Sequence, residues 1–249
     1  MGLPDASVLE RAGLAAWPGI EVDWDGGWVR RAANGYTKRA NSVQCLDPSD
    51  EGDVDARIAN AVDWFSARGL PPVFRMTPLA GPGLAIALDG LGWRSIDASY
   101  LFAMQLAAGE PDPRGQIYKV RDPAFLAVQQ RLSGYDDERL GKLDALLAAM
   151  TVAACGVVLH DDDGAPVATA LMAIADGIVV TGNVVTDASR RRQGHAGAMM
   201  RTGHAWAHAA GARVAALNVQ ADNLGAQALY QSLGYAHQYD YHYRLPGTA

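Results

Sequence analysis

The fold is decided by residues 184 to 235, which read VVTDASRRRQGHAGAMMRTGHAWAHAAGARVAALNVQADNLGAQALYQSLGY. A β-rich run ends, a turn with three consecutive arginines follows, and an alanine-rich helix then opens on small residues. We expect this helix to stop at Gly211, because glycine readily takes the left-handed conformation that closes a helix. A strand over 213–220 and a short helix, capped by Asn223 and stopped by Gly234, complete the stretch.

The flanking sequence continues this alternation of helices and strands. A helix is predicted to start at Pro123 after the capping residue Asp122, and a leucine repeat predicts a second helix over 140–150. Three β-rich runs follow, separated by Asp163-Gly164 and Asp176-Gly177, and Asp-Gly is typical of hairpin turns. The last run would place five alternating rings on one strand face: Tyr235, His237, Tyr239, Tyr241 and Tyr243. The pattern predicts a mixed α/β domain over about residues 115 to 246.

The N-terminal half repeats part of this pattern. Helix, glycine, strand, helix, Leu-Gly-aromatic and strand occur in the same order in both halves, with equal spacing from Gly69 to Gly92 and from Gly211 to Gly234. This spacing predicts an internal duplication. We expect domains at 1–110 and 115–249, joined by the linker-like segment 109–116. Before the repeat, the sequence predicts a short N-terminal helix and a hairpin about Asn34-Gly35.

The basic turn and the helix start after it could bind a phosphate. Free N–H groups and the helix dipole attract anions, and Gly194, Ala196 and Gly197 would let the backbone come close. The turn is neither a P-loop nor a Rossmann fingerprint, since neither pattern is present. Taken alone, it fits a flexible surface loop equally well.

Three motifs together resemble the GCN5-related N-acetyltransferase family. The loop matches as Arg191-x-x-Gly194-x-Ala196, and Asn223-x-x-Ala226 and Tyr230 with Leu-Gly-Tyr at 233–235 follow at the family's spacing. The resemblance covers residues 115 to 246. It implies the acyl-CoA N-acyltransferase fold, an α/β fold whose mixed central sheet is flanked by helices, here duplicated. Ala188 and Arg190 depart from the proline and the aromatic residue that the family often has, which puts the loop geometry in question.

The resemblance also implies acetyl-CoA (coenzyme A) as co-substrate, held in an opening between two splayed strands. The implied binding residues are Asn183, Val184, Val185, Arg191, Arg192, Gln193, Gly194, His195, Ala196, Gly197, Asn223 and Ala226. The backbone of 192–197 would hold the pyrophosphate, and strand residues 183–185 would pair with pantetheine. The Val185 N–H would stabilise the oxyanion. Tyr230 would protonate the departing thiolate, or is a buried core tyrosine; Asn223 would contact pantetheine, or only cap its helix.

Other features of the site are less well defined. No glutamate precedes Val184 as a general base, and Asp187, His195 and His237 fit surface or structural roles better. In the first half an acidic segment, 46–56, replaces the basic loop and would repel a pyrophosphate. We therefore expect a degenerate first half without cofactor. Residues 35–43 could line the acceptor pocket or form a plain hairpin.

Composition narrows the class of function. The net charge of −6 argues against a protein that coats nucleic acid or an anionic membrane. No apolar run reaches membrane-spanning length. Cys45 and Cys155 read as buried free thiols, which fits a cytoplasmic protein, and we expect no metal. The prediction is an N-acetyltransferase acting on a small-molecule or peptide amine. The alternative is a non-catalytic acetyl-CoA sensor or interaction module.

Overall fold

The computed structural model describes residues 2–247, which form eleven strands in one mixed sheet with helices on both faces. The elements of the first half are α1 (Ala6–Ala16), β1 (Glu21–Asp25), β2 (Trp28–Ala32), β3 (Val43–Cys45), α2 (Val54–Ser66), β4 (Phe74–Met76), α3 (Pro82–Gly90) and β5 (Arg94–Gln105). Those of the second half are β6 (Gly115–Tyr118), α4 (Pro123–Ser133), α5 (Asp137–Ala148), β7 (Ala153–His160), β8 (Pro166–Ala175), β9 (Ile178–Thr186), α6 (His195–Ala209), β10 (Val214–Gln220), α7 (Leu224–Ser232) and β11 (Ala236–Leu245). Short 3₁₀ helices lie at Lys38–Ala40 and Ala188–Arg190.

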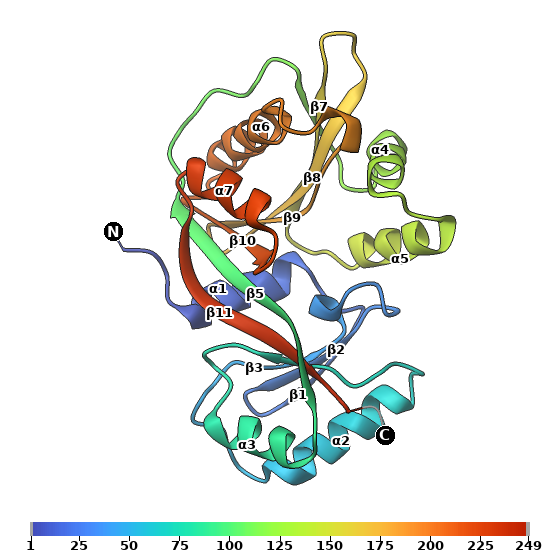
Figure 1. Cartoon of the computed structure of the whole chain (residues 1–249), viewed down its shortest axis with the longest axis vertical. Coiled ribbons are helices and arrows are strands. Elements are labelled where there is room, and N and C mark those ends of the chain that lie inside the picture. The colour runs from blue at the N-terminus through green and yellow to red at the C-terminus, as the bar shows by residue number, and fades with distance from the viewer. Residues whose placement is uncertain (1, 248–249) are drawn as a thin grey trace.

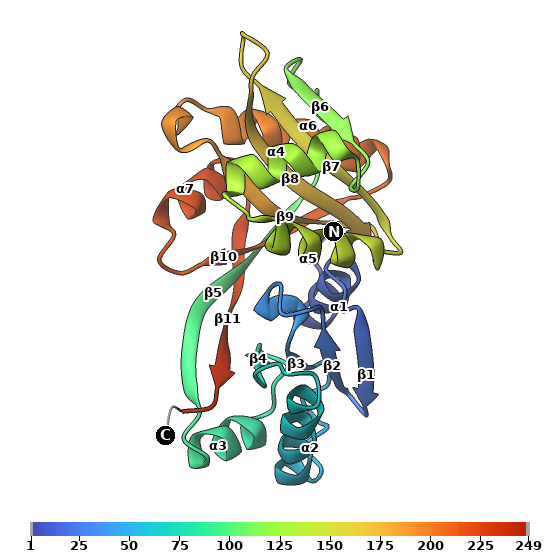
Figure 2. The same ribbon diagram turned by 90° about the vertical axis from the view of Figure 1, so that its right-hand side faces the viewer.

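The strand order confirms the duplication. The order is β1-β2-β3-β4-β11-β5-β10-β9-β8-β7-β6. If the edge strand β6 is left out and β1–β5 are taken as the counterparts of β7–β11, the order of counterparts is the same from either end of the sheet. β11 lies between β4 and β5, and β5 lies between β11 and β10, so the halves exchange their last strands. Figures 1 and 2 show β5 and β11 side by side through the centre of the molecule. Gly69, Gly92, Gly211 and Gly234 all have the left-handed backbone predicted for helix stops.

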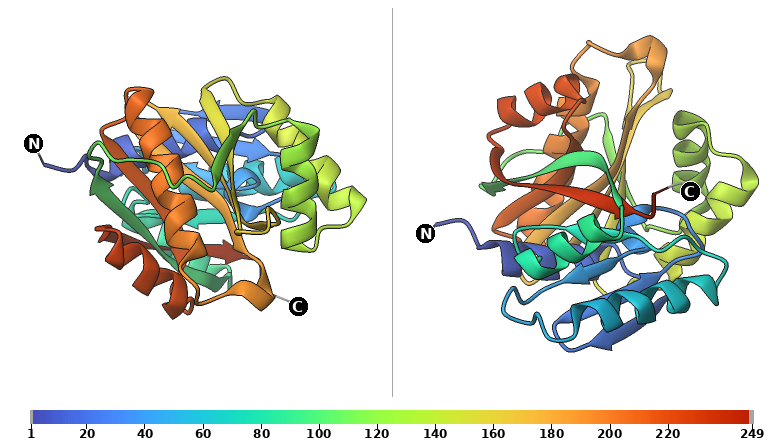
Figure 3. Two further views of the ribbon diagram at one scale, coloured as in Figure 1. Left: turned by 90° about the horizontal axis from the view of Figure 1, so that it is seen from above. Right: turned by 60° about the horizontal axis from the view of Figure 1, so that its bottom comes forward.

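Alternating side chains of β8 face two different helix layers. Ala168, Ala170 and Met172 pack against α6, while Leu171 packs against α4 and α5. Figure 3 shows these helices on opposite sides of the sheet. Helices α2 and α3 cover one face of β2–β4 in the same way. Helix α1 belongs to the first half by sequence but packs its Leu9 and Ala12 against strands of the second half. The two halves therefore share one continuous structure.

Most predicted elements are present, including the meander β7–β9. Its second turn has Asp176 and Gly177 both at positive φ, the backbone of a type I′ hairpin. Both cysteines are buried free thiols, as predicted. β1 and β6 were not predicted. The predicted hairpin about Asn34-Gly35 is instead a longer loop that contains the 3₁₀ helix, although β2 and β3 do pair antiparallel.

The prediction that five rings share one face of the last strand is wrong. The pairing of β11 with β5 slips between His237 and Tyr239 and again between Tyr241 and Tyr243. Such bulges change the side to which the following residues point. Tyr235 packs with the α6 layer, and Tyr239 lies on the other side, where its hydroxyl donates to Glu10 at 2.7 Å. No helix among residues 2–247 is both long and apolar enough to cross a bilayer.

The α6 layer contains a buried histidine that should make the fold acid-sensitive. His204 is 8% exposed, lies 2.8 Å from the Tyr235 hydroxyl through Nε2, and has its pKa lowered by burial to about 4. The unfolded chain binds a proton near pH 6.5, whereas the folded chain resists protonation until about pH 4. Stability from this group is therefore present above pH 6.5 and lost as pH falls toward 4. Between pH 7.5 and 5.0 we expect a loss of about 2 kcal/mol from this residue.

Urea unfolding at both pH values tests this expectation. His204→Gln keeps a hydrogen-bonding group beside Tyr235 but cannot titrate, so it should lose about 2 kcal/mol less than wild type over the same interval. His208→Gln, on the partly exposed side of the same helix, is the matched control and should behave like wild type. Equal acid sensitivity of His204→Gln and wild type would show that this histidine does not resist protonation.

Candidate active site

An opening forms where β9 and β10 separate. The two strands run parallel and pair from Ile178 to Thr181 on β9, and β10 then continues to Gln220 along β5. From Gly182 to Thr186, β9 has β8 on one side and no paired strand on the other within residues 2–247. Backbone groups on this free edge are available to an extended ligand, as at any open strand edge.

A bulge at Asn183 sets which amides face the opening. Asn183 has φ 48°, and the β8–β9 register slips beside it. Its side-chain amide donates to the Tyr36 hydroxyl at 3.0 Å, and its carbonyl accepts from Gln129 at 3.3 Å. These bonds hold the bulge from both sides.

Beyond the bulge, strand alternation assigns the amides. The Asp187 N–H donates to Val167 on β8 at 2.9 Å, and Val185 lies opposite Thr169 in the same register. Residues two apart on an antiparallel strand bond the same neighbour. The Val185 amide therefore faces β8, and the amides of Val184 and Thr186 face the opening. The prediction that the Val185 N–H stabilises the oxyanion is therefore corrected. The bulge adds a residue to β9 and so changes which amides point away from β8.

The basic loop curls over the start of α6. The Asp187 carboxylate accepts from the Ser189 N–H at 2.9 Å and opens the 3₁₀ helix. Arg192 and Gly194 both have left-handed backbones, and Gly194 is the N-cap of α6. A Cβ added at Gly194 would meet nothing within 4 Å, so its side lies open. Within the described residues, Arg191 and Arg192 form no ion pair. The first turn of α6 thus presents free amides beside two unpaired cations.

A cavity of about 680 Å³, the loop cavity, lies between this loop, the free edge of β9 and the start of α7. Of the predicted binding residues it is lined by Val184, Val185, Arg191, Arg192, Gly194, His195, Ala196, Gly197, Asn223 and Ala226. Asn183 does not line it but lines the cavity next to it, and Gln193 lines neither. The prediction missed Thr186, Arg190, Gly225 and Leu229. Two features of the sequence could have indicated these residues. Thr186, Arg190 and Gly225 are adjacent to predicted residues, and Leu229 follows Ala226 at helical spacing.

A second cavity of about 660 Å³, the inter-half cavity, adjoins the first. The first half contributes residues 35–39, Asp97 and Ser99, and the second half contributes residues 181–184 and 218–220 with Arg139. Residues 35–39 therefore line a cavity rather than form a plain solvated hairpin. The two cavities share Val184, Asn223, Ala226 and Tyr230.

Tyr230 lies at this boundary with its hydroxyl unbonded. The side chain is 6% exposed, and its ring packs edge-on against Tyr235 with centroids 5.9 Å apart. The hydroxyl makes no hydrogen bond to any of the described residues. Burial raises the pKa of Tyr230 to about 12, so the phenol keeps its proton at any physiological pH. It can therefore donate a proton to a group in either cavity.

The remaining predicted residues have structural surroundings. The Asn223 side chain accepts from the Ala226 N–H at 3.1 Å, which confirms its role as helix cap. Asp187 caps the 3₁₀ helix, and His237 is exposed and lies 2.6 Å from the Asp240 carboxylate. His195 is buried beside the loop cavity, and neither of its ring nitrogens has a partner within residues 2–247. None of the three candidate bases lines the inter-half cavity.

The matching place in the first half is a cavity of about 530 Å³ between the starts of α2 and α3, and Asp53 and Asp55 line it. Asp53, the N-cap of α2, has a left-handed backbone like that of Gly194. The Glu51 carboxylate accepts from the Gly83 N–H at 2.6 Å at the start of α3, the helix that matches α7. Leu88 stands where Tyr230 stands in the second half and is fully buried. The lining of this place is therefore negatively charged and would repel a phosphate.

One family model and one relative match this chain over nearly its whole length, and a second relative matches half of it. The sequence model of the family described as "Probable histone acetyltransferase Rv0428c C-terminal" matches residues 5–244. The chain is 26% identical over 249 residues to the "Uncharacterized N-acetyltransferase YobR" of Bacillus subtilis (strain 168), covering 98% of this chain and 99% of that protein. It is 33% identical over 128 residues to the "Probable histone acetyltransferase Rv0428c" of Mycobacterium tuberculosis, covering 50% of this chain and 39% of that protein.

Solved structures share the fold. The GCN5-related N-acetyltransferase from Kribbella flavida superposes with a TM-score of 0.75 at 22% identity, covering 100% of this chain and 98% of that one. A tandem GNAT protein from the clavulanic acid biosynthesis pathway superposes with a TM-score of 0.61 at 13% identity, covering 84% of this chain and 76% of that one. The tandem structure agrees with the duplicated strand order.

Proposed function

The chain belongs to the GCN5-related N-acetyltransferase family, and we propose that its second half transfers an acetyl group from acetyl-CoA to the primary amine of a small acceptor. The observation that carries this proposal is the position of Tyr230 on the wall shared by the two cavities. The loop cavity has the charge and backbone donors for a CoA pyrophosphate, and the inter-half cavity has room for the acceptor. A proton donor between them lies where the leaving thiol would need it.

The residues of the loop cavity fit acetyl-CoA. The first-turn amides from His195 to Gly197, together with Arg191 and Arg192, would hold the pyrophosphate. The open side of Gly194 leaves space for it. The free edge of β9 would pair with the pantetheine arm, and the two unpartnered nitrogens of the buried His195 would gain a polar neighbour. Bound acetyl-CoA would supply the activated acetyl group.

Protein groups would assist the transfer at two points. The Val184 N–H, on the free edge, would donate to the thioester carbonyl as charge develops on its oxygen. Tyr230 would give its proton to the sulfur as the C–S bond breaks. Of the residues lining the inter-half cavity the one carboxylate is Asp97, and it is ion-paired with Lys38 at 2.8 Å. We infer that the amine loses its proton to water, which leads to faster turnover at higher pH.

A binding and turnover experiment tests the proposal. Calorimetry should show one acetyl-CoA site per chain, because Asp53 and Asp55 give the matching place in the first half a negative charge. Thiol release from acetyl-CoA should then depend on an added amine from a broad panel. The panel should include histone peptides, since one relative is named a probable histone acetyltransferase. Two equivalent sites would contradict the degenerate first half, and tight binding without turnover on any amine would favour a sensor.

A further inference from the structure

The inter-half cavity has an excess of positive charge. Four charged side chains line it: Lys38, Arg39, Asp97 and Arg139. Lys38 and Asp97 neutralise each other at 2.8 Å. Arg139 stacks on the Tyr135 ring, 4.9 Å from its centroid, and neither Arg139 nor Arg39 has a carboxylate partner within the described residues. Two guanidinium groups therefore face a cavity without a counter-ion.

Arg39 is held firmly in its position. Its guanidinium lies 4.4 Å from the centre of the Trp17 ring, and the buried Arg31 donates to its carbonyl oxygen. The Asn41 side chain fixes the loop by accepting from the Ala33 N–H at 2.7 Å and donating to the Thr37 carbonyl at 2.7 Å. A positioned guanidinium loses little entropy when it binds a ligand.

Arg39 also lies against the strand that carries the free edge. A Cβ added at Gly182 would come within 3.1 Å of the Arg39 Nη2, so this glycine allows the guanidinium to approach the backbone of β9. Gly182 directly precedes the bulge at Asn183 and is two residues before Val184. Arg39 therefore faces the same stretch of β9 as the proposed acetyl group.

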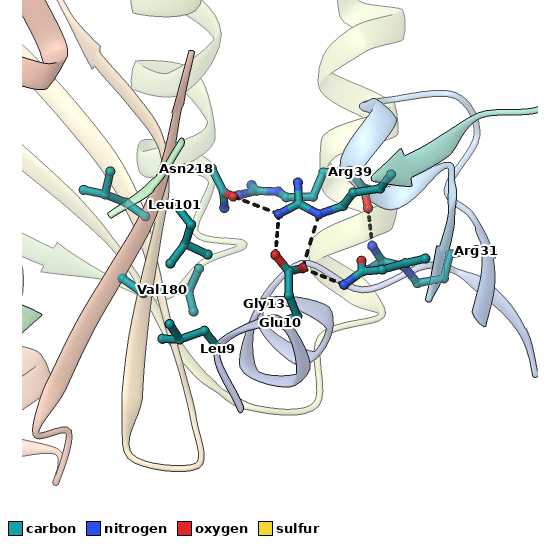
Figure 4. Close-up of a pocket in the computed structure, with 12 residues that line it drawn as sticks. Leu9, Glu10, Gly13, Arg31, Arg39, Leu101, Val180 and Asn218 are labelled. Atoms are coloured by element: carbon teal, nitrogen blue, oxygen red, sulfur yellow. Dashed lines mark hydrogen bonds and ion pairs between the residues drawn. The ribbon is translucent and has the colours of Figure 1, made fainter. Parts of the chain in front are cut away.

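The buried groups behind the cavity do not supply the missing anion. Figure 4 shows a small neighbouring pocket in which Glu10 points toward the arginines, and Arg39 and Asn218 line both this pocket and the inter-half cavity. The Glu10 carboxylate already accepts from Arg75 at 2.8 Å, Gln44 at 2.5 Å and Tyr239 at 2.7 Å. Arg31 donates to two carbonyl oxygens and has no carboxylate partner in the described part of the chain. Burial and the nearby Arg75 lower the pKa of Arg39, so its charged form is under-stabilised.

We propose that the acceptor is an amino carboxylate, whose carboxylate binds Arg39 in the inter-half cavity while its amine faces Val184 and Tyr230. A planar carboxylate matches the fork of one guanidinium and would neutralise it. The proposal rests on the proposed acetyltransferase function and names its substrate class. The amine nitrogen forms a bond to the acetyl carbon, the C–S bond breaks, the amine proton passes to water, and the thiolate takes the Tyr230 proton. The products are an N-acetylamino carboxylate and CoA, and Tyr230 regains a proton from solvent.

The same charges disfavour a polycationic acceptor. A lysine-rich peptide would bring like charges toward Arg39 and Arg139, and the one carboxylate among the residues that line the cavity, Asp97, is already ion-paired. Free amino acids and related small amines with a carboxylate have the opposite pattern. The inference thus separates two classes of primary amine that the family fold does not distinguish.

Matched pairs of amines test the proposal. Each L-amino acid should be compared with its C-terminal amide, which keeps the amine and side chain but lacks the carboxylate. We expect kcat/KM for at least one amino acid to exceed that for its amide by about 10- to 100-fold, the range for a charge-assisted bond. The preference would run against intrinsic reactivity, because the amide has the more easily deprotonated amine. O-Phosphoethanolamine and a lysine-rich peptide complete the panel, and preference for either would overturn the assignment of a carboxylate.

Variants connect the preference to Arg39. Arg39→Gln should raise KM for the amino acid about 10-fold or more and leave the amide within about twofold, while Arg39→Lys should fall between them. Arg121→Gln, which breaks an exposed ion pair with Asp144, is the matched control and should keep the wild-type preference. A thermal melt and acetyl-CoA affinity check that each variant folds. Equal loss for amino acid and amide would show a structural role for Arg39 and overturn the proposal.

A binding experiment separates this inference from the proposed function. The protein saturated with CoA is titrated with the N-acetyl derivatives of the amino-acid panel, which need no turnover to bind. Binding that Arg39→Gln abolishes supports the carboxylate site even if no amine is acetylated, in which case the acetyltransferase proposal alone fails. Turnover of amides as efficient as that of amino acids, with no binding of N-acetylamino acids, overturns the carboxylate site and leaves the acetyltransferase function intact.

Discussion

Gly194→Asp should abolish acetyl-CoA binding, raising the dissociation constant by at least about 100-fold. Gly194 caps α6 beside the first-turn amides, and its open side faces the loop cavity. A carboxylate there would stand a few ångströms from a pyrophosphate. Two like charges about 4–6 Å apart at a protein surface repel by about 3–4 kcal/mol, which corresponds to more than 100-fold in affinity. Calorimetric titration with acetyl-CoA measures the change.

Gly194→Asn is the matched control, because asparagine has the shape of aspartate without its charge. Both residues tolerate the left-handed backbone at φ 81° better than other side chains do. The molecule itself indicates that the backbone accepts aspartate, since Asp53 caps α2 with φ 48°. The asparagine variant should bind acetyl-CoA far more tightly than the aspartate variant. Near-normal affinity of a folded Gly194→Asp protein would show that this loop does not bind the pyrophosphate.

Tyr230→Phe should lower kcat about 100-fold and hardly change the affinity for acetyl-CoA. The thioester sulfur is neutral before reaction and a poor acceptor, so the hydroxyl contributes little to binding. Charge builds on sulfur as the C–S bond breaks, and a proton donor then becomes useful. An interaction made in the transition state alone affects kcat rather than KM. General-acid catalysis contributes about 10²–10⁴-fold, and a thiolate is a fair leaving group, so the low end applies.

Steady-state kinetics with the best amine, supported by a thermal melt, checks this prediction. Tyr118→Phe removes a distant exposed hydroxyl that donates to Gln116 and should leave kcat unchanged. The pKa of about 12 for Tyr230 adds a pH signature, because deprotonation of this phenol would not reduce kcat until the pH approaches 12. A folded Tyr230→Phe protein with wild-type kcat would show that Tyr230 is a core tyrosine and that the leaving thiolate takes its proton from solvent.

Much of the second half could be predicted because its signals are local. Asp122-Pro123, the two Asp-Gly turns and the stop at Gly211 each act through the backbone preferences of one or two residues. The loop cavity follows for the same reason. Its residues come from one continuous segment, 184–197, and from the start of the next helix.

Features that depend on pairing between distant segments could not be predicted. The side of the strand to which the Val185 amide points depends on the bulge at Asn183. Tyr36 and Gln129, which come from elsewhere in the chain, hold this bulge by hydrogen bonds. The five rings of the last strand do not share one face, because the register between β11 and β5 shifts twice. The alternation of rings in the sequence of β11 does not reveal these shifts. The inter-half cavity joins residues 35–39 to Tyr230, and no local spacing connects them. The sequence also did not indicate which half would receive each final strand.

The exchanged final strands have a consequence for synthesis on the ribosome. β5 is complete when Gln105 has been made, but both of its neighbours, β10 and β11, come from the last part of the chain. At about 5–20 residues per second, the nascent first half waits on the order of ten seconds with a twelve-residue strand unpaired on both edges. Arg94 and Asp97, near the exposed start of that strand, carry charges that discourage pairing with other chains. The first half can therefore lack a binding site and still be indispensable. The sheet of the second half is completed by β5, a strand that the ribosome makes long before β10 and β11.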